Sequence, residues 1–193
     1  MFCYIHCYFG SHILNHIQGL PEFCDAACRL ALGANAPCLA ENRAAGVQTL
    51  SGTGALRLAA DFLFNFFGGK ETTVFYSKPT WGNHIDIYKR AGFTKLTPYT
   101  YWNDETKCAD IGQFIADLEN APGKSIILFH ACAHNPTGAD PSQDDWKKLA
   151  DVCERKGHFP IFDTAYQVCS GNVTWNTFSN VIGCRMRPEN QKF

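Results

Sequence analysis

A chain of 193 residues with 46% hydrophobic and 13% aromatic side chains is long and apolar enough to form one domain around a buried core. Its 17 basic and 18 acidic residues give a formal net charge of −1, so no excess of positive charge is available to attract nucleic acid or an anionic membrane. No run of about eighteen apolar residues is present, so no membrane-spanning helix is predicted.

The ten cysteines are spread along the chain, mostly within apolar stretches. Disulfide frameworks are typical of small secreted domains that lack a sufficient core, and this composition does not place the chain in that class. Cys3 and Cys7, with Cys24 and Cys28 and nearby histidines, raise the alternative of a zinc site, but their spacing is unlike that of zinc-binding motifs. We predict buried reduced thiols and no metal, which favours an intracellular compartment.

The first nineteen residues are apolar and aromatic but contain no lysine or arginine. A secretory signal begins with a basic segment, and a mitochondrial presequence is rich in arginine. Neither signal is therefore predicted. The cytoplasm is favoured, with the mitochondrion as the alternative.

From Pro21 onward, helical and strand patterns alternate. Pro21 is suited to the first turn of a helix, and Gly33 is expected to end that helix. A second, strongly apolar helix is expected to end at Gly68. In this half of the chain the predicted helices span 21–32, 55–67 and 84–91, and the predicted strands lie at 47–50, 72–76 and within 93–102.

The second half continues this alternation. Asp110 is expected to cap a helix, and Asp140 is expected to cap another that runs to about Lys156. Residues 125–129 form a continuous apolar run typical of a fully buried strand, and 159–163 form the last clear strand. Helices that alternate with buried strands predict an α/β fold, with a mostly parallel sheet and helices on both faces.

Polar, glycine-containing loops follow the predicted strands. They are SGTG at 51–54, PTWGNH at 79–84, HNPTG at 134–138 and DTAY at 163–166. In α/β sheets, ligands bind at the carboxyl ends of the strands. These loops are therefore expected to converge on one binding site.

Each loop by itself permits an ordinary interpretation. Loop 51–54 could bind phosphate through its backbone N–H groups, or it could be a tight turn. It has no Walker-type lysine, and Arg57 occupies the third glycine position of a dinucleotide loop, which argues against a nucleotide-binding domain. Trp81 suits a core or a stacking surface, and Asn135 before proline suits a turn. Asp163 suits a helix cap or a ligand contact.

Together, the loops resemble those of the aspartate aminotransferases, a family that uses pyridoxal 5'-phosphate. The matching segments are VQTLSGTGALR at 47–57, KPTWGNH at 78–84, HACAHNPTG at 130–138 and FDTAYQ at 162–167. The order of these segments and the spacing between them match the family as well as their amino-acid sequences do. The resemblance implies the central part of the large domain of fold-type I enzymes over residues 17–171, while segments 1–16 and 172–193 do not match.

The resemblance also implies which residues contact the cofactor. They are Ser51, Gly52, Thr53, Trp81, Asn135, Asp163 and Tyr166. The first three would bind the phosphate at a helix N-terminus. Trp81 would stack on the pyridine ring, and Asn135 and Tyr166 would hydrogen-bond to its phenolic oxygen.

Asp163 would pair with the ring nitrogen and keep it protonated, so that the ring can accept electrons from the substrate carbon. His84 is implied to support this aspartate, with His130 and His134 as further candidates. Trp81 in its PTWGNH context indicates the aspartate branch. The implied reaction exchanges an amino group between aspartate and 2-oxoglutarate, giving oxaloacetate and glutamate.

The sequence departs from the family in one catalytic element. The Schiff-base lysine of the family lies one strand beyond the aspartate, whereas the one lysine after Asp163 is Lys192, in a different context. We therefore expect no catalytic lysine and no transaminase activity from this chain alone. The alternative is a non-catalytic fragment that binds the cofactor or a partner subunit.

Two expectations about assembly follow from the same resemblance. The family forms homodimers with shared active sites, and we expect that dimer to be weak or absent here. Strands 125–129 and 159–162 are expected to have unpaired edges, which would favour aggregation.

Overall fold

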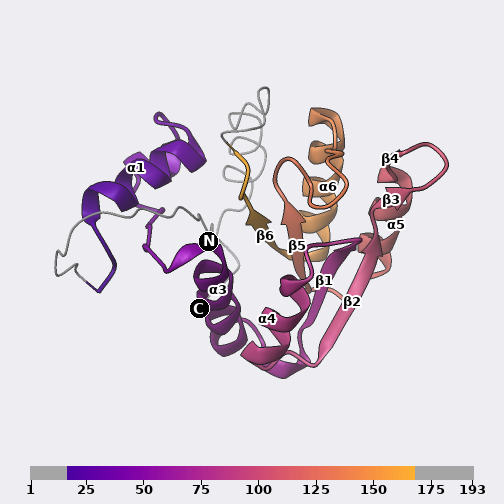
Figure 1. The fold of residues 1–193 in the computed structure, drawn as a ribbon, viewed down its shortest axis with the longest axis horizontal. Helices are drawn as coiled ribbons and strands as arrows, with labels where there is room; N and C mark the ends of the chain where they lie inside the picture. The colour runs from indigo at the N-terminus through magenta and orange to yellow at the C-terminus, as the bar shows by residue number, and fades with distance from the viewer. Residues whose placement is uncertain (1–16, 168–193) are drawn as a thin grey trace.

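The backbone forms a four-stranded parallel sheet in the order β2-β1-β5-β6 (Figure 1). The computed structural model describes residues 17–167. Its strands are β1 (Thr73–Lys78), β2 (Lys95–Thr100), β5 (Ile126–His130) and β6 (Phe159–Asp163), with a separate antiparallel pair, β3 (Trp102–Asn103) and β4 (Cys108–Ala109). The predicted α/β fold with a parallel sheet is confirmed.

Some expectations fall on residues outside the described range. They concern segments 1–16 and 172–193, the thiols of Cys3 and Cys7, and Lys192. Within 17–167, all described cysteines are free thiols, and no cluster of three potential metal ligands occurs. Of these described cysteines, only Cys132 and Cys153 are buried, so the prediction of buried thiols is wrong for exposed Cys108 and for three half-buried cysteines, Cys24, Cys28 and Cys38. In the same range no helix has the length and apolar character needed to cross a membrane.

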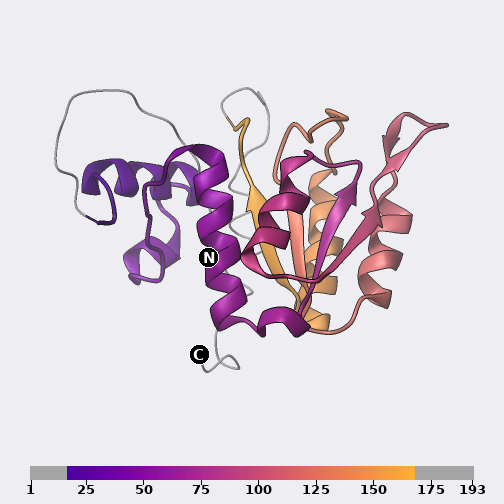
Figure 2. The same cartoon turned by 60° about the horizontal axis from the view of Figure 1, so that its bottom comes forward.

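Helices cover both faces of the sheet. The helices of the described residues are α1 (Pro21–Leu32), α2 (Pro37–Ala40), α3 (Ser51–Phe66), the short 3₁₀ helix η1 (Gly69–Glu71), α4 (Asn83–Ala91), α5 (Ile111–Asn120) and α6 (Gln143–Lys156). Helices α3 and α4 pack on one face, and α5 and α6 pack on the other (Figures 1 and 2). Helices α1 and α2 lie beyond α3, on the side away from the sheet (Figure 2).

Strand β5 shows why the sheet is buried on both sides. Successive side chains of a strand point to opposite faces, so a strand covered on both faces must be apolar at every position. Ile126 and Leu128 enter the core under α3 and α4, whereas Ile127 and Phe129 enter the core under α5 and α6. All five residues of β5 are buried.

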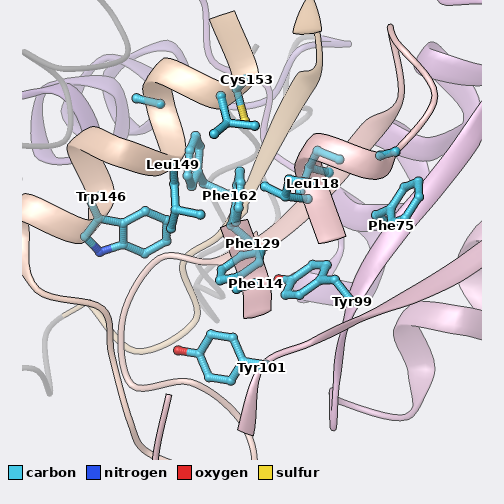
Figure 3. Packing of buried hydrophobic residues seen from close by; sticks show 14 of the residues in the cluster. Phe75, Tyr99, Tyr101, Phe114, Leu118, Phe129, Trp146, Leu149, Cys153 and Phe162 are labelled. Atoms are coloured by element: carbon cyan, nitrogen blue, oxygen red, sulfur yellow. The ribbon is translucent and has the colours of Figure 1, made fainter. Parts of the chain in front are cut away.

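Aromatic rings dominate the core under α5 and α6 (Figure 3). Phe129 of β5 stacks on Phe162 of β6 with a centroid distance of 5.2 Å, and Tyr99 of β2 stacks on Phe114 of α5 at 4.1 Å. Offset and edge-on aromatic pairs stabilise a core by about 0.5–1.5 kcal/mol beyond the area they bury. These contacts fix the strands whose carboxyl ends carry the polar loops.

Most predicted helix ends are confirmed. Gly33 and Gly92 follow the last residues of α1 and α4, as expected from their tolerance of positive φ. The Asp110 side chain accepts a hydrogen bond from the backbone N–H of Gln113 (3.1 Å) and so caps α5.

Three expectations about local structure are wrong. Residues 47–50 do not form a strand, because the N–H of Gln48 bonds to the carbonyl of Gln18 instead of to a strand of the sheet. Helix α3 begins at Ser51, four residues before the predicted start, because the apparent loop 51–54 is its first turn. Helix α6 is capped by Ser142 in a capping box with Asp145, not by Asp140.

The expectation of an unpaired edge on the strand at 125–129 is also wrong. Strand β5 pairs with β1 on one side and with β6 on the other. Strand β6 is an edge of the sheet within the described residues.

Candidate functional site

A cavity of about 470 Å³ opens at the carboxyl ends of β1, β5 and β6. All seven residues expected to contact a cofactor line it, together with His130 and three residues that were not singled out, Leu56, Cys132 and Ala165. The sheet order explains this convergence, because parallel strands end on the same edge. Residues 112 positions apart in the chain, such as Ser51 and Asp163, therefore share one cavity.

One wall of the cavity is the N-terminus of α3. The cap position is Leu50, which has no side chain able to accept a hydrogen bond and is largely exposed. The first N–H groups of a helix have no partner within the helix, and the helix dipole favours negative charge there. Ser51, Gly52 and Thr53 therefore offer backbone donors and two hydroxyl groups to an anion in the cavity.

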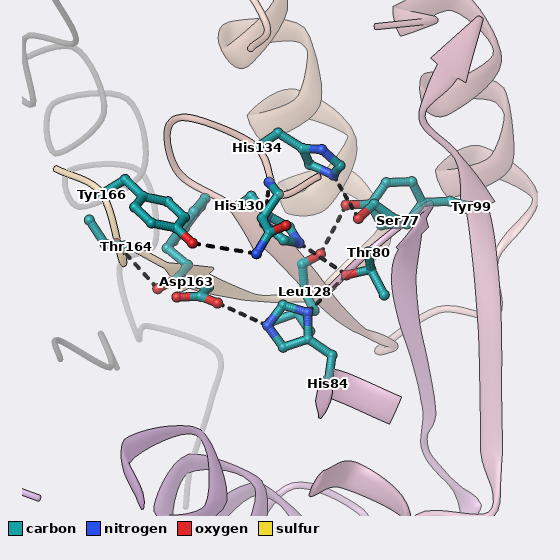
Figure 4. A network of polar contacts seen from close by, with 12 residues as sticks. Ser77, Thr80, His84, Tyr99, Leu128, His130, His134, Asp163, Thr164 and Tyr166 are labelled. Carbon is teal, nitrogen blue, oxygen red and sulfur yellow. Dashed lines mark hydrogen bonds and ion pairs between the residues drawn. The ribbon is translucent and has the colours of Figure 1, made fainter. Parts of the chain in front are cut away.

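Another part of the cavity lining is Asp163, at the end of β6 (Figure 4). Its Oδ2 accepts a hydrogen bond from Nε2–H of His84, at 2.9 Å. Its Oδ1 is buried and has no hydrogen-bond partner among the described residues. A buried carboxylate oxygen without a partner is costly, so this atom is suited to accept from a ligand donor in the cavity.

A chain of hydrogen bonds fixes the direction in which His84 donates (Figure 4). The backbone N–H of Asn135 donates to Nδ1 of His130 (3.3 Å), so the hydrogen of this neutral ring lies on Nε2. That hydrogen is donated to Oγ1 of Thr80 (3.0 Å), and the Thr80 hydroxyl donates to Nδ1 of His84 (2.8 Å). The remaining ring hydrogen of His84 therefore points at Asp163.

Burial keeps His130 in the neutral form that this chain requires. Its pKa is lowered from 6.5 to about 4, first by burial and then by the neighbouring His84. Because His130 carries one ring hydrogen at neutral pH, it cannot donate from both nitrogens, and the direction of every bond is set. Thr80, the link between the two histidines, was not identified from the sequence, although it lies within the quoted loop 78–84.

His134 occupies a different place from the other two histidines. Its Nδ1 bonds to Thr137 (2.8 Å) and its Nε2 bonds to Ser77 (2.9 Å), and its ring stacks on Tyr101 with a centroid distance of 3.8 Å. Burial, followed by the neighbouring His130 and His84, lowers its pKa to about 3. His134 thus holds the loop after β5 and makes no hydrogen bond to Asp163.

The remaining polar and aromatic side chains complete the rim. The Nδ2 group of Asn135 donates to the hydroxyl oxygen of Tyr166 (3.4 Å), and both residues line the cavity. Trp81 lies edge-on to His84, with ring centroids 5.4 Å apart. Among the described residues, no lysine lines the cavity.

These features fit pyridoxal phosphate group by group. The helix N-terminus suits a phosphate, Trp81 offers an aromatic surface, and Asn135 with Tyr166 offers polar groups to an oxygen. The partnerless Oδ1 of Asp163 suits a protonated ring nitrogen. A neutral aromatic ligand without an anionic group would leave the α3 donors unused.

Comparisons with known proteins identify the family of the chain. The sequence profile described as "Aminotransferase class I and II" matches residues 10–185. The chain belongs to this family.

Among its relatives, the cytoplasmic aspartate aminotransferase of Caenorhabditis elegans is 51% identical over 158 residues, which are 80% of this chain and 38% of the relative. The cytoplasmic aspartate aminotransferase of Gallus gallus is 46% identical over 165 residues, which are 82% of this chain and 40% of the relative. The chain thus spans about two fifths of the length of these enzymes.

Solved structures give the same result for the fold. The mitochondrial aspartate aminotransferase of Trypanosoma brucei superposes with a TM-score of 0.85 at 36% identity, over 94% of this chain and 48% of that one. An aromatic-amino-acid aminotransferase of Burkholderia pseudomallei, covalently bound to pyridoxal phosphate, superposes with a TM-score of 0.83 at 28% identity, over 90% of this chain and 43% of that one. The fold is therefore that of fold-type I aminotransferases that use this cofactor.

Proposed function

We propose that this chain carries the pyridoxal phosphate site of an aspartate aminotransferase. The reaction of such an enzyme exchanges an amino group between aspartate and 2-oxoglutarate and yields oxaloacetate and glutamate. Support for the substrate comes from the names of the Caenorhabditis and Gallus relatives. The fold is shared with aromatic aminotransferases, so the fold does not select the substrate.

The observation that carries this proposal is the buried Oδ1 of Asp163. His84 donates to the other oxygen, Oδ2, so Oδ1 is left without a donor. A protonated pyridine nitrogen would supply both the missing donor and the matching positive charge. When bound, the cofactor supplies a ring that accepts electrons from the substrate carbon.

Each remaining group has a role in holding the cofactor. Ser51, Gly52 and Thr53 would bind the phosphate at the start of α3, and Trp81 would cover one face of the ring. Asn135 and Tyr166 would hydrogen-bond to the phenolic oxygen of the ring. The protein thus contributes binding, orientation and a fixed charge at the ring nitrogen, while the ring contributes the electron-accepting chemistry.

The 193-residue chain by itself is proposed to bind this cofactor reversibly and without a covalent bond. No lysine lines the cavity in the part of the chain that the structure describes. Without a positioned lysine there is neither a covalent link to the cofactor nor a base at the substrate carbon. We accordingly propose no transamination above the rate of the free cofactor.

Equilibrium dialysis with pyridoxal phosphate and with ATP tests the ligand class. We expect saturable binding of pyridoxal phosphate at one site per chain, competition by pyridoxine phosphate and no competition by ATP. Binding of ATP in place of pyridoxal phosphate would contradict the proposal.

The location of the protein is proposed to be cytoplasmic, as it is in the names of the Caenorhabditis and Gallus relatives. The mitochondrial enzyme of Trypanosoma brucei shows that the same fold also serves the alternative compartment. Fluorescent tagging of the protein in its own cells distinguishes the two locations.

A further inference from the structure

The loop from Ala131 to Asp140 closes on itself through the carboxylate of Asp140. Oδ2 of Asp140 accepts from the backbone N–H of Ala133 (2.7 Å), and Oδ1 accepts from the N–H of His134 (3.0 Å). Both carboxylate oxygens are therefore used on two consecutive amides. Ala133 has a φ of +46°, in the left-handed region that residues other than glycine rarely adopt, so this turn needs external support.

A second set of contacts ties the same loop to the end of β2. The Tyr101 hydroxyl donates to the carbonyl of Ala139 (2.6 Å), and the Tyr101 ring stacks on His134. The pKa of Tyr101 is raised above its usual value, first by burial and then by the charge of Asp140, so its hydroxyl remains a donor. The loop is thus held at its own end by the carboxylate of Asp140 and from the residue after β2 by the phenol of Tyr101.

Asn135 follows the two clamped amides directly. Its backbone N–H donates to Nδ1 of His130, and its side-chain amide contacts Tyr166 at the rim of the cavity. A displacement of residues 133 and 134 would therefore move both the first donor of the chain that reaches Asp163 and the amide that faces the cavity. Ser142 caps the following helix, so the carboxylate of Asp140 is not used as a helix cap and binds the loop instead.

We infer that Asp140 is a positioning residue of the cofactor site, whose carboxylate fixes Asn135 by binding the N–H groups of Ala133 and His134. Asp140 is not among the residues that line the cavity. The local clamp is independent of the proposed function, whereas its effect on the cofactor rests on the proposed binding of pyridoxal phosphate.

Amide hydrogen exchange in the cofactor-free chain tests the clamp itself. The variant Asp140→Asn keeps the size of the side chain but places an NH₂ group opposite one of two backbone donors, so one bond is lost. We expect the Ala133 and His134 amides to exchange about tenfold faster or more, since bonds to charged groups are among the stronger ones. The matched control Asp144→Asn removes an exposed carboxylate paired with Lys147 on α6 and should leave these amides unchanged. Equal exchange in Asp140→Asn and wild type would overturn the inference.

A double-mutant cycle tests whether Asp140 acts through Asn135. We expect Asp140→Asn to weaken pyridoxal phosphate binding about tenfold in the wild-type background and to have no further effect in an Asn135→Ala background. An equal loss in both backgrounds would show a general structural effect and overturn the inference. If the wild-type chain binds no pyridoxal phosphate, the proposed function fails, and the exchange experiment alone decides whether the clamp exists.

Discussion

Nε2 of His84 lies 2.9 Å from Oδ2 of Asp163, although 79 residues separate them in the chain. His84 is in the first turn of α4, just beyond β1, and Asp163 is the last residue of β6. In the sheet, β5 lies between these two strands, and its last residue His130 is in register with Asp163. The pairing therefore depends on the order of the strands and on the end of β5 as much as on the two residues themselves.

Removing the donor of His84 should destabilise the chain. In His84→Ala, both oxygens of Asp163 would be buried without a partner, and an unsatisfied buried group costs about 1–3 kcal/mol or more when it is charged. Urea denaturation should show this loss as a lower midpoint with an unchanged slope. His84→Gln, whose amide N–H can reach the position of Nε2, should recover part of it. Equal midpoints for wild type and His84→Ala would show that the bond contributes nothing to stability.

The hydroxyl of Thr80 should matter more than its methyl group. Thr80→Val keeps the shape of the side chain but leaves Nδ1 of His84 and Nε2 of His130 without their common partner. We expect a destabilisation of roughly 1–3 kcal/mol and weaker cofactor binding. Thr80→Ser, which retains the hydroxyl, should behave nearly like wild type. If serine and valine variants lose stability equally, the methyl group and not the hydrogen bond is the important feature.

Stability should fall as the pH is lowered below neutrality. Burial holds the pKa of His130 at about 4 and that of His134 at about 3, and it also lowers the pKa of His158. Since the unfolded chain binds these protons near pH 6.5 and the folded chain does not, the unfolding free energy decreases from about pH 6.5 downward. For His130 alone the loss by pH 4 is roughly 3 kcal/mol.

Denaturation curves at several pH values between 7 and 5 measure this effect before most carboxylates titrate. Replacing His130 by Asn should make the pH dependence shallower over this interval. A flat profile in the wild type from pH 7 to pH 5 would be incompatible with buried neutral histidines.

Borohydride reduction tests the proposed absence of a covalent link. After incubation of the 193-residue chain with pyridoxal phosphate, reduction and peptide mapping should find no lysine modified at one equivalent per chain. Cofactor should also be removed by dialysis without reduction. A single stoichiometric pyridoxyl-lysine together with turnover of aspartate would show that a lysine of this chain reaches the site.

The sequence made the layered fold predictable because its signals are local. The unbroken apolar run of β5 and the glycines after α1 and α4 each act within a few residues. The seven expected contact residues were identified from the amino-acid sequences of the loops, and the sheet brings them to one cavity. Their roles toward the cofactor are proposals that the experiments above address.

What remained unpredictable depends on contacts between distant segments. The sequence of a parallel strand does not indicate which strands pair with it, so the position of β5 between β1 and β6 was not predicted. Asp140 precedes proline and helix α6, and its pattern resembles a cap, whereas its carboxylate turns back to the loop before it. Thr80 has no distinguishing pattern at all, since its partners His84 and His130 meet only in the folded chain.

The affinity of the 193-residue chain for pyridoxal phosphate, with and without the Asp163 carboxylate, tests the central claim most directly. Titration should show one site in the wild type and an affinity lower by roughly 10- to 100-fold in Asp163→Asn, as expected for loss of a charge-assisted bond. The control Asp144→Asn, which removes an exposed carboxylate on α6, should bind like the wild type. Equal affinity of wild type and Asp163→Asn, or no saturable binding by either, would contradict the assignment of this cavity to the cofactor.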